Sequence, residues 1–463
     1  MTHLLTRTIP YGLLVGGISL GVAGCSTITL PESSTPERTE ELTILWDKGY
    51  VIEEDEAIEA VISDWQKITG KPVKLSFYNS GEIAPKTLRA SRAGLSPDIL
   101  FSAKSVYPIS DWQGKLADVT DVVAAEASGL TPEALQAAKV YGENEYTDSG
   151  TSDRYYAVPL NQSIIQIHFW KDFLTQAGYT PTDIPQAWEP FWEFWKTVQD
   201  RLQAQGLNVY AFGLPYSRAA KDSYHFFEQI LVAYDVALLD SQGNLQVDRP
   251  EIRAEIIRCL RWYVDFYEQG YAPPKTTTWS DPDNNRNFLN RQVLMTPNPT
   301  LSIPAAIRNN EDLYFHQMGT IAWPDKPNGQ PLPHLLETRR AIIFADAAHL
   351  EEAKAFLSYL IQPEVINQFL KTSYGRFMPA NEVLGSDPFW QNPRDPHIST
   401  ATNIVLSGYT QPLNLVLNPA YGVVLEENIW GQVLQAMVED GLSPEAAADR
   451  AISQIKQIFA DWS

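Results

Sequence analysis

The sequence has 463 residues and a formal net charge of −21, because 56 aspartates and glutamates outweigh 35 lysines and arginines. This length exceeds the roughly 250–300 residues that one hydrophobic core supports, so we expect more than one core-bearing unit. A hydrophobic content of 44% indicates a folded protein rather than a disordered one. Most of such an acidic surface would repel a phosphate backbone, which argues against a nucleic-acid partner.

Residues 1–24 have the features of a signal peptide. A basic Arg7 precedes an apolar run of about 15 residues from Ile9 to Ala23, which is too short to cross a ~30 Å hydrocarbon core. The run ends in Val-Ala-Gly-Cys, which resembles the lipobox of bacterial lipoproteins and implies that Cys25 becomes a lipidated N-terminus. An ordinary signal peptide that happens to end near a cysteine is the alternative. Residues 25–39 are rich in Ser, Thr, Glu and Pro and are expected to form a flexible tether.

Strands and helices alternate over the next part of the chain. Hydrophobic periodicity predicts strands at 42–46, 73–78 and 97–101, with helices through 58–68 and 86–93 between them. This order predicts an α/β fold with a parallel sheet, in which ligands bind beyond the carboxyl ends of the strands. The residues that follow the three strands are Asp47, Lys48, Tyr50, Asn79, Ser80, Glu82, Ser102 and Lys104.

The remaining chain is more helical and shows no linker between sequential domains. Helices are predicted at 188–203, at 250–269 and from Pro444 to Trp462, and apolar strands at 293–295 and 340–344. Because no linker divides the chain, two lobes that interleave along the sequence are expected.

No catalytic or cofactor motif stands out in the sequence. Glycine-rich phosphate loops, nucleophile elbows and paired Cys-x-x-Cys motifs do not occur, and the seven histidines lack metal-ligand spacing. The segment 281–285 imitates the start of a calcium loop, but Arg286 and Gln292 replace the required Gly and Glu. We therefore expect no metal and no cofactor. Cys259 lies on a probable helix and is expected to be a buried structural thiol.

Several blocks, in their order along the chain, resemble the extracellular solute-binding proteins of family 1, the maltose-binding-protein type. The resemblance covers nearly the whole chain after the tether. The blocks are 42–46, 97–101, 156–160, 167–173, 177–179, 184–191, 298–302, 353–357, 363–364 and 374–381.

This resemblance implies two α/β lobes joined by crossing strands, with a carbohydrate or similar polyhydroxylated solute bound in the cleft between them. Hinge closure would deliver the solute to the transmembrane permease subunits of an ABC importer, without enzymatic change. The protein would be a lipid-anchored component of the cell envelope that faces the periplasm or the exterior. Crossings are expected near 160–164, 295–300 and 343–347. The first lobe is then 40–160 with 300–343, and the second is 164–295 with 347–463.

A sugar needs hydrogen-bonding side chains for its hydroxyl groups and an aromatic face for its apolar side. The rings of Trp46, Tyr50, Tyr216, Tyr224 and Trp279 lie beside predicted strand ends or loops, whereas Trp65, Trp192, Trp195 and Trp262 have the helical spacing of core residues. The expected ligand-binding residues are Trp46, Asp47, Asn79, Ser102, Tyr216, Trp279, Asp281, Asn298 and Arg376.

Two alternatives stay open at this level. A secreted carbohydrate-active enzyme, of the glycoside hydrolase kind, would need two facing carboxylates, which sequence-distant segments could supply. Adjacent acids such as Glu53–Glu54 or Glu426–Glu427 point apart and do not meet that need. A chemosensory or adhesion protein with the same fold is the other alternative, and solute uptake would not depend on it.

The lipidation site can be tested directly. Replacing Cys25 with Ala removes the thiol that accepts the lipid, so the variant is expected to lose acylation and normal lipoprotein processing. Mass spectrometry of the mature N-terminus measures this. An unmodified wild-type N-terminus at another residue would contradict the assignment.

Overall fold

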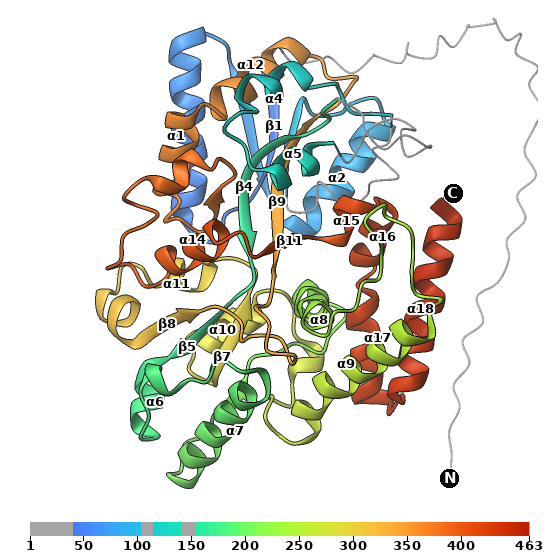
Figure 1. Cartoon of the computed structure of the whole chain (residues 1–463). Coiled ribbons are helices and arrows are strands. Elements are labelled where there is room, and N and C mark those ends of the chain that lie inside the picture. The colour runs from blue at the N-terminus through green and yellow to red at the C-terminus, as the bar shows by residue number, and fades with distance from the viewer. Residues whose placement is uncertain (1–39, 103–113, 140–153, 463) are drawn as a thin grey trace, which may run out of the picture. The chain divides into compact units, whose positions relative to one another are not determined.

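The computed structural model describes residues 40–102, 114–139 and 154–462, so the signal segment, Cys25, the tether and Lys104 lie outside the described residues. From Glu40 onward the chain forms one unit, and its strands form two sheets, which lie one above the other in Figure 1. The strands of the first sheet are β1 (Leu42–Asp47), β2 (Val73–Tyr78), β3 (Ile99–Phe101), β4 (Val158–Ile164), β9 (His334–Ile343), β10 (Met378–Pro379) and β11 (Thr410–Pro412). Those of the second sheet are β5 (Gln166–Trp170), β6 (Tyr210–Phe212), β7 (Val293–Asn298) and β8 (Met318–Ile321).

The first sheet has the order β10-β4-β9-β3-β1-β2, and β11 pairs with β9. The expected parallel unit is confirmed, because β1 pairs in parallel with both β2 and β3. β9 runs antiparallel to β3 and β4. The carboxyl ends of β1 and β2 are aligned by the pairing of Asp47 with Tyr78, so the loops after them leave the same edge of the sheet.

The second sheet has the order β6-β7-β5-β8. β5 pairs antiparallel with β7 and β8, and β6 is parallel to β7. Every residue of β5 and β7 is buried, as expected for strands covered by helices on both faces. The expected α/β class is confirmed.

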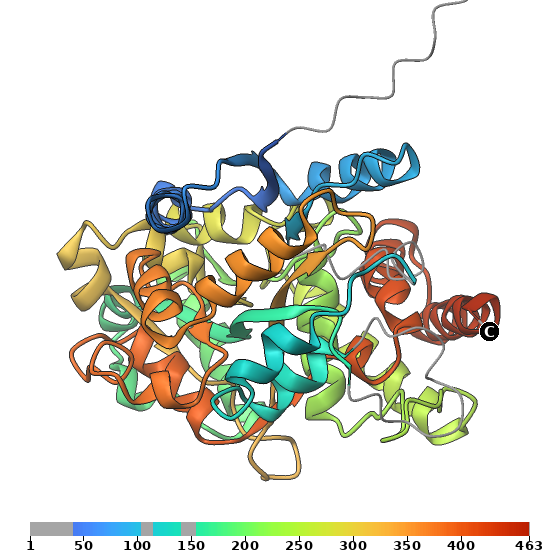
Figure 2. The same cartoon turned by 90° about the horizontal axis from the view of Figure 1, so that it is seen from above.

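Helices cover both sheets, and Figure 2 shows the dark-blue and orange helices on the left and the red C-terminal helices on the right. Beside the first sheet lie α1 (Ile52–Thr69), α2 (Ser80–Arg92), α4 (Thr120–Glu126), α5 (Pro132–Ala138), α12 (Leu350–Leu360), α13 (Pro363–Thr372) and α14 (Ile398–Leu406). The second core contains α6 (Lys171–Gln176), α7 (Trp188–Ala204), α8 (Lys221–Ala233), α9 (Pro250–Glu268), α10 (Asp283–Leu289), α11 (Ser302–Ala306), α15 (Asn414–Leu417), α16 (Ala420–Glu426), α17 (Ile429–Asp440) and α18 (Pro444–Trp462). Short 3-10 helices are η1 (Pro181–Asp183), η2 (Thr276–Thr278) and η4 (Val383–Ser386), and η3 (Asp312–Gln317) is a π-helix. Within the described ranges, no helix is both long and apolar enough to cross a membrane.

The sheets divide the chain differently from the expected lobe boundaries. The chain first passes between the sheets at Ile165, from β4 to β5. β8 pairs with β5, so 318–321 belongs to the second sheet, although the expected first lobe was 300–343. The chain returns to the first sheet only at β9, and α12 to α14 pack against the first core although 347–463 was assigned to the second lobe. Short crossing segments carry no periodic pattern of their own, so hydrophobic periodicity does not locate them.

Trp46 lies in the first core at the end of β1. It is 3% exposed. Its ring packs against Phe101 in a tilted arrangement, with the ring centroids 4.1 Å apart, and meets Phe369 edge-on at 6.2 Å. Cys259 is a free, buried thiol on α9, as expected for a structural cysteine. Burial raises its pKa, which keeps it in the unreactive thiol form.

Replacing Trp46 with Ala should remove this packing and lower the free energy of unfolding by ~3–5 kcal/mol. Chemical denaturation measures the loss. Ile68→Ala is the control, because Ile68 is 70% exposed on α1 and its truncation should change stability little. Equal stability of both variants would contradict a core role for Trp46.

Candidate functional site

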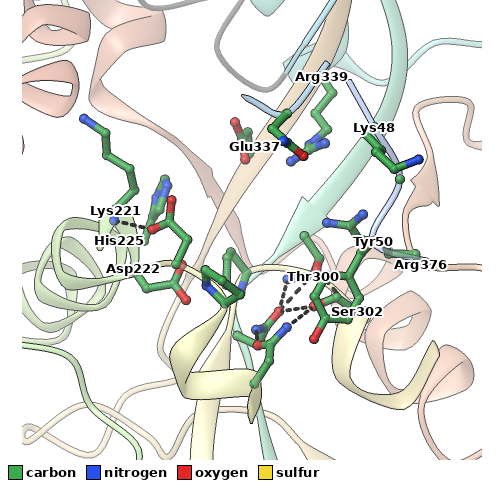
Figure 3. Close-up of a pocket in the computed structure, with 17 residues that line it drawn as sticks. Lys48, Tyr50, Lys221, Asp222, His225, Thr300, Ser302, Glu337, Arg339 and Arg376 are labelled. Atoms are coloured by element: carbon green, nitrogen blue, oxygen red, sulfur yellow. Dashed lines mark hydrogen bonds between the residues drawn. The ribbon is translucent and has the colours of Figure 1, made fainter. Parts of the chain in front are cut away.

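A polar cleft of about 450 Å³ lies where the loops after β1, β2 and β7 meet the start of α8 (Figure 3). Its volume falls in the ~300–1,000 Å³ range of small-molecule sites. The lining residues are Lys48, Gly49, Tyr50, Asn79, Lys221, Asp222, His225, Asp281, Pro282, Asn285, Asn298, Pro299, Thr300, Ser302, Glu337, Arg339 and Arg376. The cleft is therefore bounded by elements of both sheets.

The loop after β1 is held by acids in the first turn of α1. Asp55 accepts hydrogen bonds of 2.8 Å from both the Lys48 ammonium and the Gly49 amide, and Glu54 accepts one of 3.0 Å from the Tyr50 amide. Carboxylates at a helix N-terminus favourably bind such free amides. A Cβ on Gly49 would lie 2.6 Å from the Glu54 Cβ, so only glycine permits this close approach.

Arg376 follows α13 and binds the same helix start. One of its Nη atoms donates to both carboxylate oxygens of Glu54, at 2.9 and 2.8 Å. Both side chains are mostly buried, so the pair is screened by solvent less than a surface ion pair. The Arg376 guanidinium also lies 5.6 Å from the centre of the Tyr50 ring. This contact orients the ring at the cleft wall.

The floor of the cleft is a network of buried amides and hydroxyls. Asn298 accepts from the Thr300 amide at 2.9 Å and donates to Asn285 at 2.6 Å. Asn285 in turn donates to the Ser302 hydroxyl at 3.0 Å. The Asn298 side chain thus shapes the turn after β7.

The opposite wall is the start of α8. Lys221 donates from its amide to the Asp281 carboxylate, and its ammonium donates to the Leu425 carbonyl at 2.9 Å. The pKa of Asp222 is raised well above its ordinary value, mainly by burial and secondly by the negative charge of Asp281. Burial likewise lowers the pKa of His225. The low-dielectric wall therefore favours the uncharged forms of Asp222 and His225.

A buried carboxyl group, that of Glu228, anchors α8 to the C-terminal helices. It accepts from the Tyr421 hydroxyl at 2.5 Å, the Trp430 indole at 2.7 Å and the Asn414 amide at 2.9 Å. Burial is the main cause that raises its pKa to about 7. Through these bonds α15, α16 and α17 hold the wall that carries Lys221.

β9 contributes the top of the cleft in Figure 3. Glu337 and Arg339 are two residues apart on this strand and line the cleft, whereas Leu336 and Thr338 alternate with them. The Arg339 guanidinium lies 4.3 Å from the centre of the Phe377 ring.

Four of the nine expected ligand-binding residues line the cleft. They are Asn79, Asp281, Asn298 and Arg376. Trp46 and Asp47 instead line an adjoining recess of about 50 Å³, together with Lys48, Arg339 and Arg376.

The other three expected residues lie elsewhere. Ser102 is buried and donates to Asp47 at 2.8 Å, so it supports that carboxylate. Tyr216 is fully buried and donates to the Tyr263 carbonyl at 2.8 Å, so its side chain packs in the core and does not line the cleft. Trp279 is buried beside a different hollow, formed with Tyr210 and Pro274. Tyr224 is also a core residue, so Tyr50 is the one ring among the five expected stacking candidates that lines the cleft.

The residues from α8 and β9 were missed. Lys221 and Asp222 begin a helix whose other residues are mostly apolar, and this contrast was an available signal. Glu337 and Arg339 alternate with buried residues on a strand, which also marks one face as polar. No cluster of His, Cys, Asp or Glu able to hold a metal occurs among the described residues.

Comparisons with known proteins agree with this architecture. Residues 60–400 match the sequence profile of the family described as bacterial extracellular solute-binding protein. The multiple sugar-binding protein of Streptococcus mutans is 22% identical over 372 residues, which cover 76% of this chain and 79% of that protein.

Solved structures show the same fold. An ABC transporter solute-binding protein from Thermotoga lettingae, bound with alpha-D-tagatose, has a TM-score of 0.74 and 18% identity, covering 91% of this chain and 100% of the other. The maltose-bound MalE3 of T. maritima has a TM-score of 0.73 and 18% identity, covering 90% and 99%. Both of these similar structures are two-lobed α/β proteins, which confirms the expected fold class.

Replacing Asp222 with Asn should stabilise the protein at pH 8 and have little effect near pH 4. Because burial raises the pKa of Asp222 in the folded protein, its carboxyl group contributes fully to folding stability only below the pKa of the unfolded chain, and this contribution is lost as the pH rises. Asn does not ionise, so the variant avoids the loss. Melting temperatures at several pH values measure this.

Asp183→Asn is the control with the opposite sign. Hydrogen bonds from Thr180 lower the pKa of Asp183, so its contribution exists at high pH and is lost as the pH falls. A melting temperature of Asp222→Asn below that of the wild type at pH 8 would contradict the assigned direction.

Proposed function

Because this chain belongs to the bacterial extracellular solute-binding protein family, we propose that it captures a carbohydrate or a similar polyhydroxylated solute and delivers it unchanged to an ABC permease. The observation that carries the proposal is the cleft between the two sheets, whose lining is rich in hydrogen-bond donors and acceptors. The names of the sugar-binding relative and of the sugar-bound structural neighbours support the ligand class.

Sugar hydroxyls donate and accept hydrogen bonds at once, so both kinds of partner are needed around the ring. Asn79 and Arg376 lie on the first-sheet side and Asp281 on the α8 side, so one solute would contact both lobes. The Tyr50 ring would cover an apolar sugar face. A ligand held from both sides binds the closed form better than the open form, which drives hinge closure.

We place the lobes according to the sheets. The first lobe comprises 40–164 with 334–406, and the second comprises 166–321 with 413–462. The crossing segments are then the β4–β5 junction, the loop from β8 to β9, and the segment that contains β11. Closure would rotate the wall that contains α8 toward the loop after β1.

A lipid on Cys25 would keep the protein at the membrane that holds the permease. If 25–39 is the flexible tether expected from the sequence, its root-mean-square reach would be roughly 20 Å, which would let the lobes turn without leaving the surface. The protein would therefore act in the cell envelope, facing the periplasm or the exterior.

The competing hypothesis of a glycoside hydrolase would need Asp222 and Asp281, which line the same cleft, to act as an acid–base pair. The comparisons do not support this hypothesis. Family membership favours binding without reaction, and Asp281 is already engaged by the Lys221 amide.

Incubation of the purified mature protein with neutral mono- and oligosaccharides should raise its melting temperature for the matching sugar, since ligand at 100 Kd adds ~2.7 kcal/mol to folded-state stability. Calorimetry should give one sugar per chain, and chromatography should recover that sugar unchanged. Product formation that is lost in Asp222→Asn would show an enzyme instead. Uptake that does not depend on the protein would contradict the transport role.

A further inference from the structure

A second pocket, of about 470 Å³, lies in the first lobe and is independent of the cleft. Its floor is formed by Gln162 of β4, Leu336 of β9 and the two residues of β10. We call it the α14 pocket, after the helix that forms one wall. Its lining residues are Thr131, Pro132, Glu133, Gln162, Leu336, Met378, Pro379, Asn381, Glu382, Gly385, Thr402, Val405, Leu406, Gly408 and Thr410.

The α14 pocket and the cleft region lie on opposite faces of the same two strands. On β4, Asn161 lines the recess beside the cleft whereas Gln162 lines the α14 pocket. On β9, Glu337 lines the cleft whereas Leu336 lines the α14 pocket. Successive residues of a strand point to opposite faces, so a solute in the cleft does not occupy the α14 pocket.

The wall opposite α14 is formed where the start of α5 meets the segment after β10. The Thr131 amide donates to the Ala380 carbonyl at 3.0 Å, and the Glu382 amide donates to the Gly129 carbonyl at 2.9 Å. These bonds fix one side of the pocket in place. Its volume therefore belongs to the folded structure of the first lobe.

Two buried polar atoms of the pocket lining have no hydrogen-bond partner among the described residues. Gln162 is 0% exposed and donates from Nε2 to Thr131 at 2.7 Å and to Thr338 at 3.3 Å, while its Oε1 is unpartnered. Thr402 is 2% exposed, and its Oγ1 is also unpartnered. Burying such groups without a hydrogen bond is costly, so both atoms favour a ligand that supplies hydrogen-bonding groups at the floor.

The charge of the lining is entirely negative. It contains Glu133 and Glu382 and no Lys, Arg or His, and neither carboxylate makes a hydrogen bond or ion pair with its side chain in the described part of the chain. Apolar side chains complete the walls, and Leu406 is 45% exposed at the pocket. Each feature favours one part of a ligand. The acceptor at the floor favours a hydrogen-bond donor, the aliphatic wall favours an apolar chain, and the carboxylates favour a positive charge.

We propose that the α14 pocket binds a small aliphatic amino alcohol. Its hydroxyl group would donate to Gln162 Oε1 and bond Thr402, its methylene chain would lie against Leu336 and Leu406, and its ammonium group would face Glu133 and Glu382. A carboxylic acid of the same length would be repelled by the two glutamates. A diol would lose the attraction to them.

The test uses the mature protein and matched ligands of four, five and six carbons. For each length, the amino alcohol, the diol and the hydroxy acid are titrated by calorimetry and ligand-observed NMR. The amino alcohol should bind at least about tenfold more tightly than the hydroxy acid at one of these lengths. Equal or tighter binding of the hydroxy acid, or of the diol, would overturn the proposal, as would no binding by any amino alcohol.

Variants assign the binding to this pocket. Thr402→Val keeps the shape of the side chain and removes the unpartnered hydroxyl. The variant should therefore bind the amino alcohol about 2- to 10-fold more weakly, without a lower melting temperature. Glu382→Gln should weaken binding of the amino alcohol about 2- to 5-fold, because it removes one of the two negative charges. Glu351→Gln, an exposed change at the start of α12, is the control and should have no effect. Binding that neither Thr402→Val nor Glu382→Gln alters would place the amino alcohol elsewhere and overturn the assignment.

Discussion

The antiparallel pairing of β4 with β9 is the constraint on which the rest of the structure depends. The two strands are paired from Val158–Ala341 to Ile164–Leu336, in the middle of the first sheet. Each strand is also joined directly to the second sheet. β4 leads through Ile165 into β5, and the loop after β8 leads into β9. Their register therefore sets where the lobes are joined and which side chains face the cleft. Shifting it by one residue would exchange Arg339 for Arg340 on the cleft face.

Electrostatics gives the two walls of the cleft different characters. On the first-sheet side, Asp55 binds Lys48 and Glu54 binds Arg376, so these charges are paired and the loop after β1 is held by hydrogen bonds. On the α8 side, burial disfavours ionisation of Asp222, and Glu228 below it is held by three donors. A preorganised polar surface of this kind binds hydroxyl groups without first having to be ordered.

Local patterns predicted much of the fold. The strand at 73–78 was predicted with its observed bounds, and the helices beginning at Trp188 and Pro250 were predicted to within one residue at their ends. Core tryptophans such as Trp195 were separated from other aromatics by their helical spacing. Tyr216 was not, because a residue in a loop has no periodicity that reveals whether the loop is covered by helices. Local patterns likewise do not show which sheet β8 joins, since β8 is short and its partner β5 is far away in sequence.

The sequence by itself determined the α/β class, the aligned ends of β1 and β2, and the segments from which Asn79 and Arg376 reach the cleft. These follow from hydrophobic spacing and chain order, which act over a few residues at a time. Only the tertiary structure decided that Arg376 binds Glu54, that Lys221 meets Asp281, and that β9 brings Arg339 to the same place. The physical reason is that these contacts join segments far apart in the chain, through strand registers and helix packing that no local pattern encodes.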